Sequence, residues 1–209
     1  MKLFNTLIAA LLSFGLMSSA VAVAAQSPEE MIKDASQRVM KILDEESQRI
    51  ADDPDYALRL VDEVIMPLID FDAMTKLTLG RHWRDATPEQ RECFMGEFKV
   101  MLVRTYSRSL ADYTGARVVY LPARGDASSG RVTVYTEVDR GDGRPRVPVN
   151  YSLRQVGNEW LVYDVTIDGL SLVKNYRTSF NEEIAQSSLQ ALIERLATAN
   201  RKGEVDPVQ

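Results

Sequence analysis

The chain has 209 residues, of which 45% are hydrophobic and 26% charged, with a formal net charge of -5 and a sequence pI ≈ 5.1. An acidic chain without a basic run is a poor nucleic-acid binder, and it lacks a polybasic segment for anionic lipid surfaces. Residues 26–202 are enough for one domain with a substantial core and too few for two.

The N-terminal segment has the composition of a secretory signal peptide. Lys2 gives a positive start, an apolar stretch runs to Met17, and the small residues at 20–25 offer A-x-A cleavage sites. The apolar run is short for a membrane span, although a retained anchor is the alternative interpretation. We expect residues 1–25 to be a signal peptide, 26–202 to form the domain, and 203–209 to be a flexible tail.

Three helix starts are written in the sequence. Residues 27–30 (S-P-E-E) and 87–90 (T-P-E-Q) combine a capping hydroxyl, proline at the first helical position and Glu or Gln three residues after the cap, and Asp53 with Pro54 forms a shorter version. The first two starts in chain order, at residues 27 and 53, open amphipathic runs that we interpret as ordinary surface helices. A short helix is predicted between a capping Asp70 and Gly80.

The helix predicted from Pro88 to about Tyr113 has a wider apolar face than the others. That face carries long, deformable or aromatic side chains, including Met101, Tyr106 and Leu110. Such a face usually packs into a core, and the alternative is that it lines a cavity for acyl chains. Cys93 lies in the same helix and is interpreted as a small buried hydrophobe, since a single cysteine cannot form an intramolecular disulfide.

Beyond Gly115 the apolar period changes from 3.6 to 2, which indicates strands at residues 118–121, 132–138, 147–153 and 160–167. Short glycine-containing turns between them predict an antiparallel meander with one dry face. Pro148 predicts a sheet edge or a bulge near the third strand. The apolar parity of the fourth strand changes partway along, which predicts a bulge near Asp164.

The fourth strand is expected to turn at Gly169 and pass directly into a helix that lies over its own sheet, and a last helix is expected to begin at residues 187–190 (S-S-L-Q). Helices first, a sheet next and helices last predict an α+β single domain. The expected architecture is a twisted four-stranded antiparallel sheet with helices packed on one face, enclosing an apolar cavity.

The sequence offers little catalytic chemistry. His82 is the only histidine and Cys93 the only thiol, so neither the usual zinc ligand set nor a complete catalytic triad is indicated, and no nucleotide-binding motif occurs. One enzymic alternative stays open: Asp164 or Asp168, desolvated in an apolar slot, could serve as the base of an isomerase or hydrolase. The alternative roles are a bulged backbone for Asp164 and a turn for Asp168. Arg177 could meet a headgroup phosphate or pair with an acidic side chain.

Two separated blocks resemble the MlaC family, also called the toluene-tolerance family. Residues 164–180 read D-V-x-I-x-G-x-S-L-V-x-N-Y-R-x-x-F, and residues 79–94 read L-G-x-x-W-R-x-x-T-x-x-Q-R-x-x-F, followed by T-Y-S-x-x-L at 105–110. The resemblance runs from about Pro28 to about Leu196. It implies a periplasmic phospholipid carrier without catalytic residues, metal or cofactor, in which bound phospholipid is cargo.

The resemblance also implies partners. Such carriers shuttle phospholipid between an outer-membrane lipoprotein complex of the MlaA type and an inner-membrane ABC transporter with an MCE-domain ring of the MlaD type. That transport supports outer-membrane lipid asymmetry and tolerance of solvents. We expect a monomer that binds no nucleic acid.

Our hypothesis places acyl chains between the inner face of the sheet and the helices that cover it. A periplasmic chaperone with exposed apolar grooves is the second alternative. The expected lipid-binding residues are Met101, Tyr106, Leu110, Val132, Val134, Val147, Val149, Tyr151, Trp160, Val162, Leu172, Val173 and Tyr176.

Overall fold

A computed structural model describes residues 26–204, with all side chains in that range except those of 108, 109, 111 and 125–127. The predicted signal peptide and residues 205–209 lie outside the described residues. The helices and strands follow one another as α1 (Pro28–Asp52), α2 (Pro54–Leu60), the π-helix η1 (Val61–Ile65), the 3-10 helix η2 (Met66–Leu68), α3 (Phe71–Leu79), α4 (His82–Asp85), α5 (Pro88–Ser107), the 3-10 helix η3 (Arg108–Tyr113), β1 (Arg117–Asp126), the 3-10 helix η4 (Ala127–Ser129), β2 (Arg131–Asp139), β3 (Val147–Val156), β4 (Glu159–Ile167), β5 (Leu170–Ser171), α6 (Leu172–Gln186) and α7 (Leu189–Lys202).

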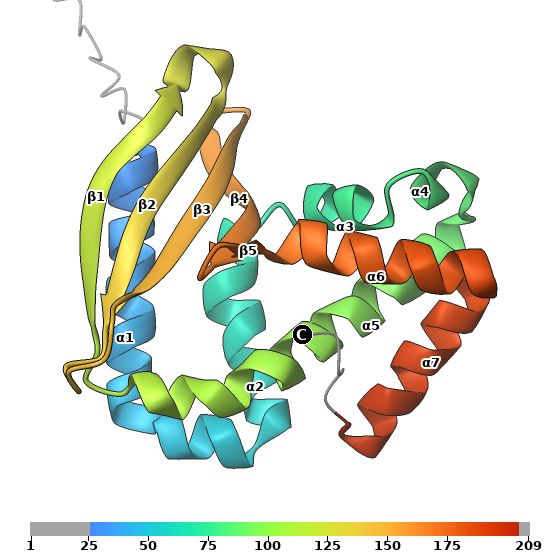
Figure 1. The fold of residues 1–209 in the computed structure, drawn as a ribbon, viewed down its shortest axis with the longest axis horizontal. Helices are drawn as coiled ribbons and strands as arrows, with labels where there is room; N and C mark the ends of the chain where they lie inside the picture. The colour runs from blue at the N-terminus through green and yellow to red at the C-terminus, as the bar shows by residue number, and fades with distance from the viewer. Residues whose placement is uncertain (1–25, 205–209) are drawn as a thin grey trace, which may run out of the picture.

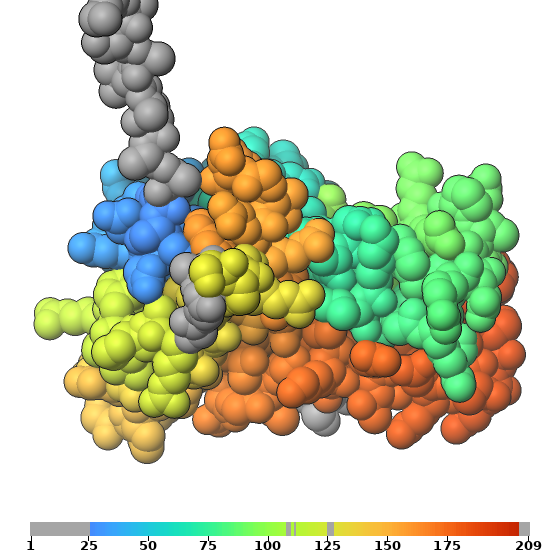
Figure 2. Space-filling model, turned by 90° about the horizontal axis from the view of Figure 1, so that it is seen from above, coloured from blue at the N-terminus to red at the C-terminus, as the bar shows by residue number. Residues whose placement is uncertain are grey.

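The predicted α+β architecture is confirmed, with one more strand than expected. The sheet is antiparallel with the order β1-β2-β3-β4-β5, and the added strand β5 is two residues long. Helix α1 packs against the sheet, whereas α4, α6 and α7 lie at the other end of the molecule (Figure 1). The space-filling view shows the same division between a sheet end and a helical end (Figure 2).

Side-chain caps fix the three predicted helix starts. At α1 the hydroxyl of Ser27 accepts a hydrogen bond from the Glu30 amide, and the Glu30 carboxylate accepts one from the Ser27 amide. Asp53 caps α2, and Thr87 with Gln90 forms the same reciprocal pair at α5. These bonds satisfy amides that have no partner inside the helix. The start of the last helix was predicted one residue early, because Ser188 caps α7 while Ser187 ends α6.

The predicted bulge near Asp164 is confirmed. Ser152 of β3 pairs with Asp164, while Leu153 pairs with Val162, so Tyr163 is an extra residue in β4. The extra residue places Val162 and Val165 on the same face of the sheet, although their spacing would otherwise put them on opposite faces.

The prediction of a sheet edge at the third strand is wrong, and the bulge predicted near that strand lies opposite Ser152 and Leu153, away from Pro148. Strand β3 is in the middle of the sheet, and Pro148 pairs with Glu137 of β2 in regular register. The Pro148 carbonyl accepts a hydrogen bond from the Asp168 amide, just past the last paired residue of β4. Because the nitrogen and carbonyl of one strand residue point to the same side, the missing N–H lies where the ladder with β4 ends.

Helix α6 does not lie over its own sheet as expected. It follows β5 directly and then runs away from the sheet, alongside α3 and toward α7 (Figure 1). Its buried face packs into an aromatic cluster formed by Phe71, Phe94, Phe98, Tyr176 and Phe180, whose ring centroids lie 5.4 to 5.9 Å apart. The hydrophobic contact of α6 is therefore with other helices.

The buried apolar side chains form three clusters. The first contains the aromatic cluster together with aliphatic side chains of α3, α5, α6 and α7, including Met74, Met101 and Val173, and keeps that name. A second cluster packs Met31 and Ile32 of α1 against β2, β3 and β4, and a third joins α1, α2 and α5 around Leu43, Ile50 and Val103. Cys93 belongs to none of them, since it is exposed, and the prediction that it is buried is wrong. Helix α5 turns its aromatic face inward at Phe94, one residue away.

Candidate functional site: an apolar cavity between the helices

A cavity of about 310 Å³ lies where the three clusters meet. Its wall combines Leu43 and Val103 of the third cluster, Phe71 and Met74 of the aromatic cluster, and Val165 of the sheet. All but three of its lining side chains are apolar. The lining residues are Val39, Ile42, Leu43, Ile50, Ala57, Leu60, Val61, Val64, Ile65, Met66, Ile69, Phe71, Met74, Lys99, Leu102, Val103, Tyr106, Ser107, Leu110, Val165 and Leu172.

The N-terminal helices supply much of this wall. Val39, Ile42 and Leu43 belong to α1, while the π-helix η1 contributes three of its five residues. A π-helix has i→i+5 hydrogen bonds, and such turns are frequent at functional sites. Both helices lie at the surface as interpreted, since Lys41 of α1 and Arg59 of α2 are exposed, but the interpretation missed that their apolar sides line a cavity. Their apolar stripes did not predict this, because the hydrophobic pattern of a helix is the same whether its apolar face contacts a packed core or a cavity.

Three of the predicted lipid-binding residues line the cavity. Tyr106 comes from α5, Leu110 from η3, and Leu172 from the first turn of α6. The helix starting at Pro88 thus contributes to the cavity wall, which is the less common of the two roles considered for its wide apolar face.

The other ten predicted residues lie outside this lining. Met101, Val173 and Tyr176 are buried in the aromatic cluster; Val132, Val134 and Val162 are buried between the sheet and α1, with Tyr151 and Trp160 packed against them; Val147 and Val149 are half-buried on β3. Val147, Val149 and Tyr151 face the same side of the sheet as Val165, through their pairing with β2 and β4. Contact between these ten residues and a lipid stays a prediction.

The aromatic polar groups near the cavity favour their neutral forms. Burial raises the pKa of the Tyr106 phenol, although a side-chain hydrogen bond with Tyr176 acts in the opposite direction. Burial raises the pKa of Tyr151 to about 12, although a hydrogen bond with Thr136 acts in the opposite direction. A phenol that stays protonated adds no charge to an apolar site.

The carboxylates considered for catalysis are placed in structural roles. Asp164 is buried, and its two oxygens accept hydrogen bonds from the Ser171 hydroxyl at 2.6 Å and the Val173 amide at 3.1 Å. It thereby caps the start of α6. Asp168 is exposed in the turn before Gly169 with φ 50, and neither carboxylate lines the cavity.

Arg177 and His82 also lie outside the cavity lining. The Arg177 side chain packs over the backbone of Gly80, where an added Cβ would stand 3.1 Å from Nε. Glycine at position 80 therefore leaves room for the guanidinium. His82 is the first residue of the four-residue helix α4.

Two general features of the described chain bear on the class of site. Between residues 26 and 204 no group of three or more His, Cys, Asp or Glu side chains is arranged to hold a metal ion. None of the helices in the same range is both long and apolar enough to cross a bilayer.

Comparisons with known proteins give one consistent result. The family model described as MlaC protein matches residues 33–198. The chain is 26% identical over 166 residues to the toluene tolerance protein ttg2D of Pseudomonas putida, covering 79% of this chain and 76% of that protein. It is 20% identical over 178 residues to the intermembrane phospholipid transport system binding protein MlaC of Haemophilus influenzae, covering 84% and 83%.

A solved structure extends the comparison to three dimensions. The phospholipid-binding protein from Ralstonia solanacearum, in complex with a phospholipid, superposes with a TM-score of 0.78 and 29% identity. The superposition covers 85% of this chain and 99% of the other. Because the family model spans residues 33–198 and the fold superposes over 85% of the chain, the chain belongs to the MlaC family.

Proposed function

We propose that the protein is a periplasmic carrier of phospholipid and that acyl chains occupy the helix-lined cavity. One observation carries the proposal: an almost entirely apolar cavity of about 310 Å³ in a fold whose Ralstonia solanacearum relative is in complex with a phospholipid. The volume falls within the range of about 300–1,000 Å³ that is typical of ligand pockets.

Elementary solvation explains why such a carrier needs a dry cavity. A diacyl phospholipid exposes on the order of thirty methylenes, each worth about 0.8 kcal/mol on burial, so free passage through water costs roughly 20 kcal/mol or more. A wall of valine, leucine and isoleucine side chains offers the chains an equivalent apolar environment. The phosphate-bearing headgroup stays at the mouth, because burying a charge without a partner is far more costly.

The proposed lipid contacts follow the cavity wall. Tyr106, Leu110 and Leu172 contact acyl chains directly in this proposal, together with the lining residues of α1, α2 and η1. The inner face of the sheet, represented by Val149 and Tyr151, forms the next layer beyond Val165. A second acyl chain or a longer one would reach that layer.

The cellular setting is proposed from the sequence and the family. The predicted signal peptide supports export to the periplasm. The carrier would pass phospholipid between an outer-membrane lipoprotein complex of the MlaA type and an inner-membrane ABC transporter with an MlaD-type ring, and so maintain outer-membrane lipid asymmetry. We propose that the protein acts by binding and not by catalysis, and the structural roles of both candidate carboxylates outside the cavity support this.

Native purification followed by organic extraction and mass spectrometry tests the proposal. We expect phospholipid to co-purify with the mature protein in a fixed ratio. A protein that yields no phospholipid, and acquires none from phospholipid vesicles, contradicts the proposal and favours the chaperone alternative. Turnover of a small molecule that Asp164→Asn abolishes would favour the enzyme alternative.

A further inference from the structure

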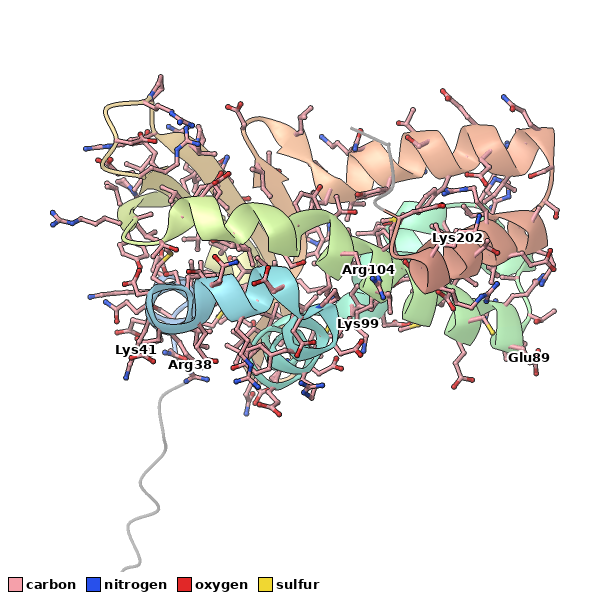
Figure 3. The ribbon with its side chains drawn as sticks, turned by 90° about the horizontal axis from the view of Figure 1, so that it is seen from below. Arg38, Lys41, Glu89, Lys99, Arg104 and Lys202 are labelled. Carbon is pink, nitrogen blue, oxygen red and sulfur yellow. The ribbon has the colours of Figure 1, made fainter. Side chains whose placement is uncertain are left out.

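One charged side chain interrupts the apolar wall of the cavity. Among the described residues that line it, Lys99 is the only one with a formal charge, and the other polar ones are Tyr106 and Ser107. Lys99 lies on α5 (Figure 3). Its amine pairs with the carboxylate of Asp62 in η1 at 2.8 Å. A charged amine beside an apolar wall costs free energy unless an anion or water contacts it.

The exposure of the pair places it at the boundary between cavity and solvent. The Lys99 side chain is 28% exposed and that of Asp62 is 51% exposed. An ion pair this close to water is worth little, so another anion can displace Asp62 at small cost. The lysine chain can also keep its methylenes against the apolar wall while its amine stays at the water boundary.

Neighbouring cations do not share this position. In Figure 3, Arg38 and Lys41 on α1 and Lys202 on α7 lie clearly apart from Lys99. Arg104, further along α5, extends toward Gly203 and lies outside the cavity lining. Among the residues that the structure describes, Lys99 is therefore the one cationic side chain in the cavity wall.

We propose that Lys99 is the ligand for the lipid phosphate and that Asp62 occupies its amine when no phosphate is present. This inference rests on the proposed function. An acyl chain that enters the cavity leaves its phosphate at the mouth, where a lysine acts as a point charge for a phosphate oxygen. The phosphate displaces the Asp62 carboxylate from Lys99, and no covalent bond changes.

Competition between two lipids with the same acyl chains tests the assignment. The mature protein is incubated with vesicles containing equal amounts of a phosphatidylglycerol and the matching diacylglycerol. Mass spectrometry then gives the ratio of bound phosphatidylglycerol to bound diacylglycerol. Because only phosphatidylglycerol has the phosphate, Lys99→Met should lower this ratio about fivefold without lowering the amount of diacylglycerol bound. Lys99→Arg should restore the ratio.

The matched variant Asp62→Asn separates the two roles of the ion pair. Loss of the competing carboxylate should raise the ratio in this variant, so Lys99→Met and Asp62→Asn act in opposite directions. If the ion pair only holds η1 against α5, the lipid ratio should change in the same direction in both variants, and that result would overturn the assignment. The incubation is made in buffer free of inorganic phosphate, and equal binding of the two lipids by the wild-type protein there would also overturn the assignment.

The experiment distinguishes this inference from the function on which it rests. If wild-type protein acquires neither lipid from the vesicles, the proposed carrier function fails. If it acquires both lipids and neither variant changes their ratio, the carrier function stands and the role of Lys99 is refuted. Thermal unfolding of each variant confirms that the comparison is made between folded proteins.

Discussion

Filling the cavity from Leu172 is the most direct test of where acyl chains bind. Leu172→Trp adds about six heavy atoms at a side chain that lines the cavity, and these displace on the order of six methylenes of the cargo. At about 0.8 kcal/mol for each methylene, the loss is about 5 kcal/mol, or about three and a half orders of magnitude in affinity. We therefore expect the purified variant to contain little or no phospholipid.

The matched control lies two residues away in the chain. Leu170 is 65% exposed and does not line the cavity, so Leu170→Trp makes the same chemical change outside the site and should leave the bound lipid unchanged. The assay is the molar ratio of extracted phospholipid to protein, together with a thermal unfolding curve for each variant.

A second filling variant guards against a ring that turns out of the cavity. Ala57 lines the cavity and is 2% exposed, so the ring in Ala57→Phe has no route to solvent. Overpacking costs typically about 1–3 kcal/mol of stability, which a folded domain tolerates. Wild-type lipid content in both Leu172→Trp and Ala57→Phe, with both folded, would refute the cavity as the lipid site.

Three further predictions concern the framework around the cavity. Phe98→Ala removes a fully buried ring that packs against four others and should lower stability by about 4 kcal/mol, or about 8–16 °C in Tm by calorimetry; an unchanged Tm would contradict the packing described. The pKa of Tyr151 is raised from 10.0 to about 12, so its neutral phenol contributes its full stabilisation of the fold below pH 10, and this stabilisation is lost as the pH rises to 12. Urea unfolding should show that the free energy of unfolding falls by about 3 kcal/mol between pH 10 and 12 in the wild type and that this fall is absent in Tyr151→Phe. An equal dependence of the unfolding free energy on pH in the two proteins would refute the prediction. Asp164→Ala leaves the Ser171 hydroxyl and the Val173 amide without their acceptor and should cost about 2 kcal/mol, whereas a loss of small-molecule turnover with unchanged stability would restore the catalytic alternative.

Local rules predicted the framework well. The capping pairs at Ser27 and Thr87 are short-range chemistry, and the structure shows them bond for bond. The bulge at Tyr163 was also predictable, because a change in apolar parity within one strand requires an extra residue if both halves face the core. Such features depend on neighbours in the chain and so can be predicted from sequence.

The position of the cavity could not be predicted in the same way. The pattern of α1 shows which face avoids water, but Val39 and Ile42 would look identical against a solid core. The valines at 132 and 134 have the same character and pack tightly against Met31 and Ile32. Hydrophobic periodicity identifies dry surfaces, whereas the gap between them depends on long-range packing. Cys93 shows that exposure is equally hard to predict, because it lies at the border of the wide apolar face of α5 and the sequence does not show where that face ends.

The bulge in β4 makes the outline of the hollow adjustable independently of its chemistry. Tyr163 is supernumerary in the ladder, so its deletion would leave Val162 and Val165 facing inward and Asp164 facing α6. Only the local bend would relax. Deleting a regularly paired neighbour such as Thr166 would instead invert the facing of the residues on one side of the deletion. Length change at this one position therefore offers a way to retune curvature around the cargo while every contacting side chain is retained.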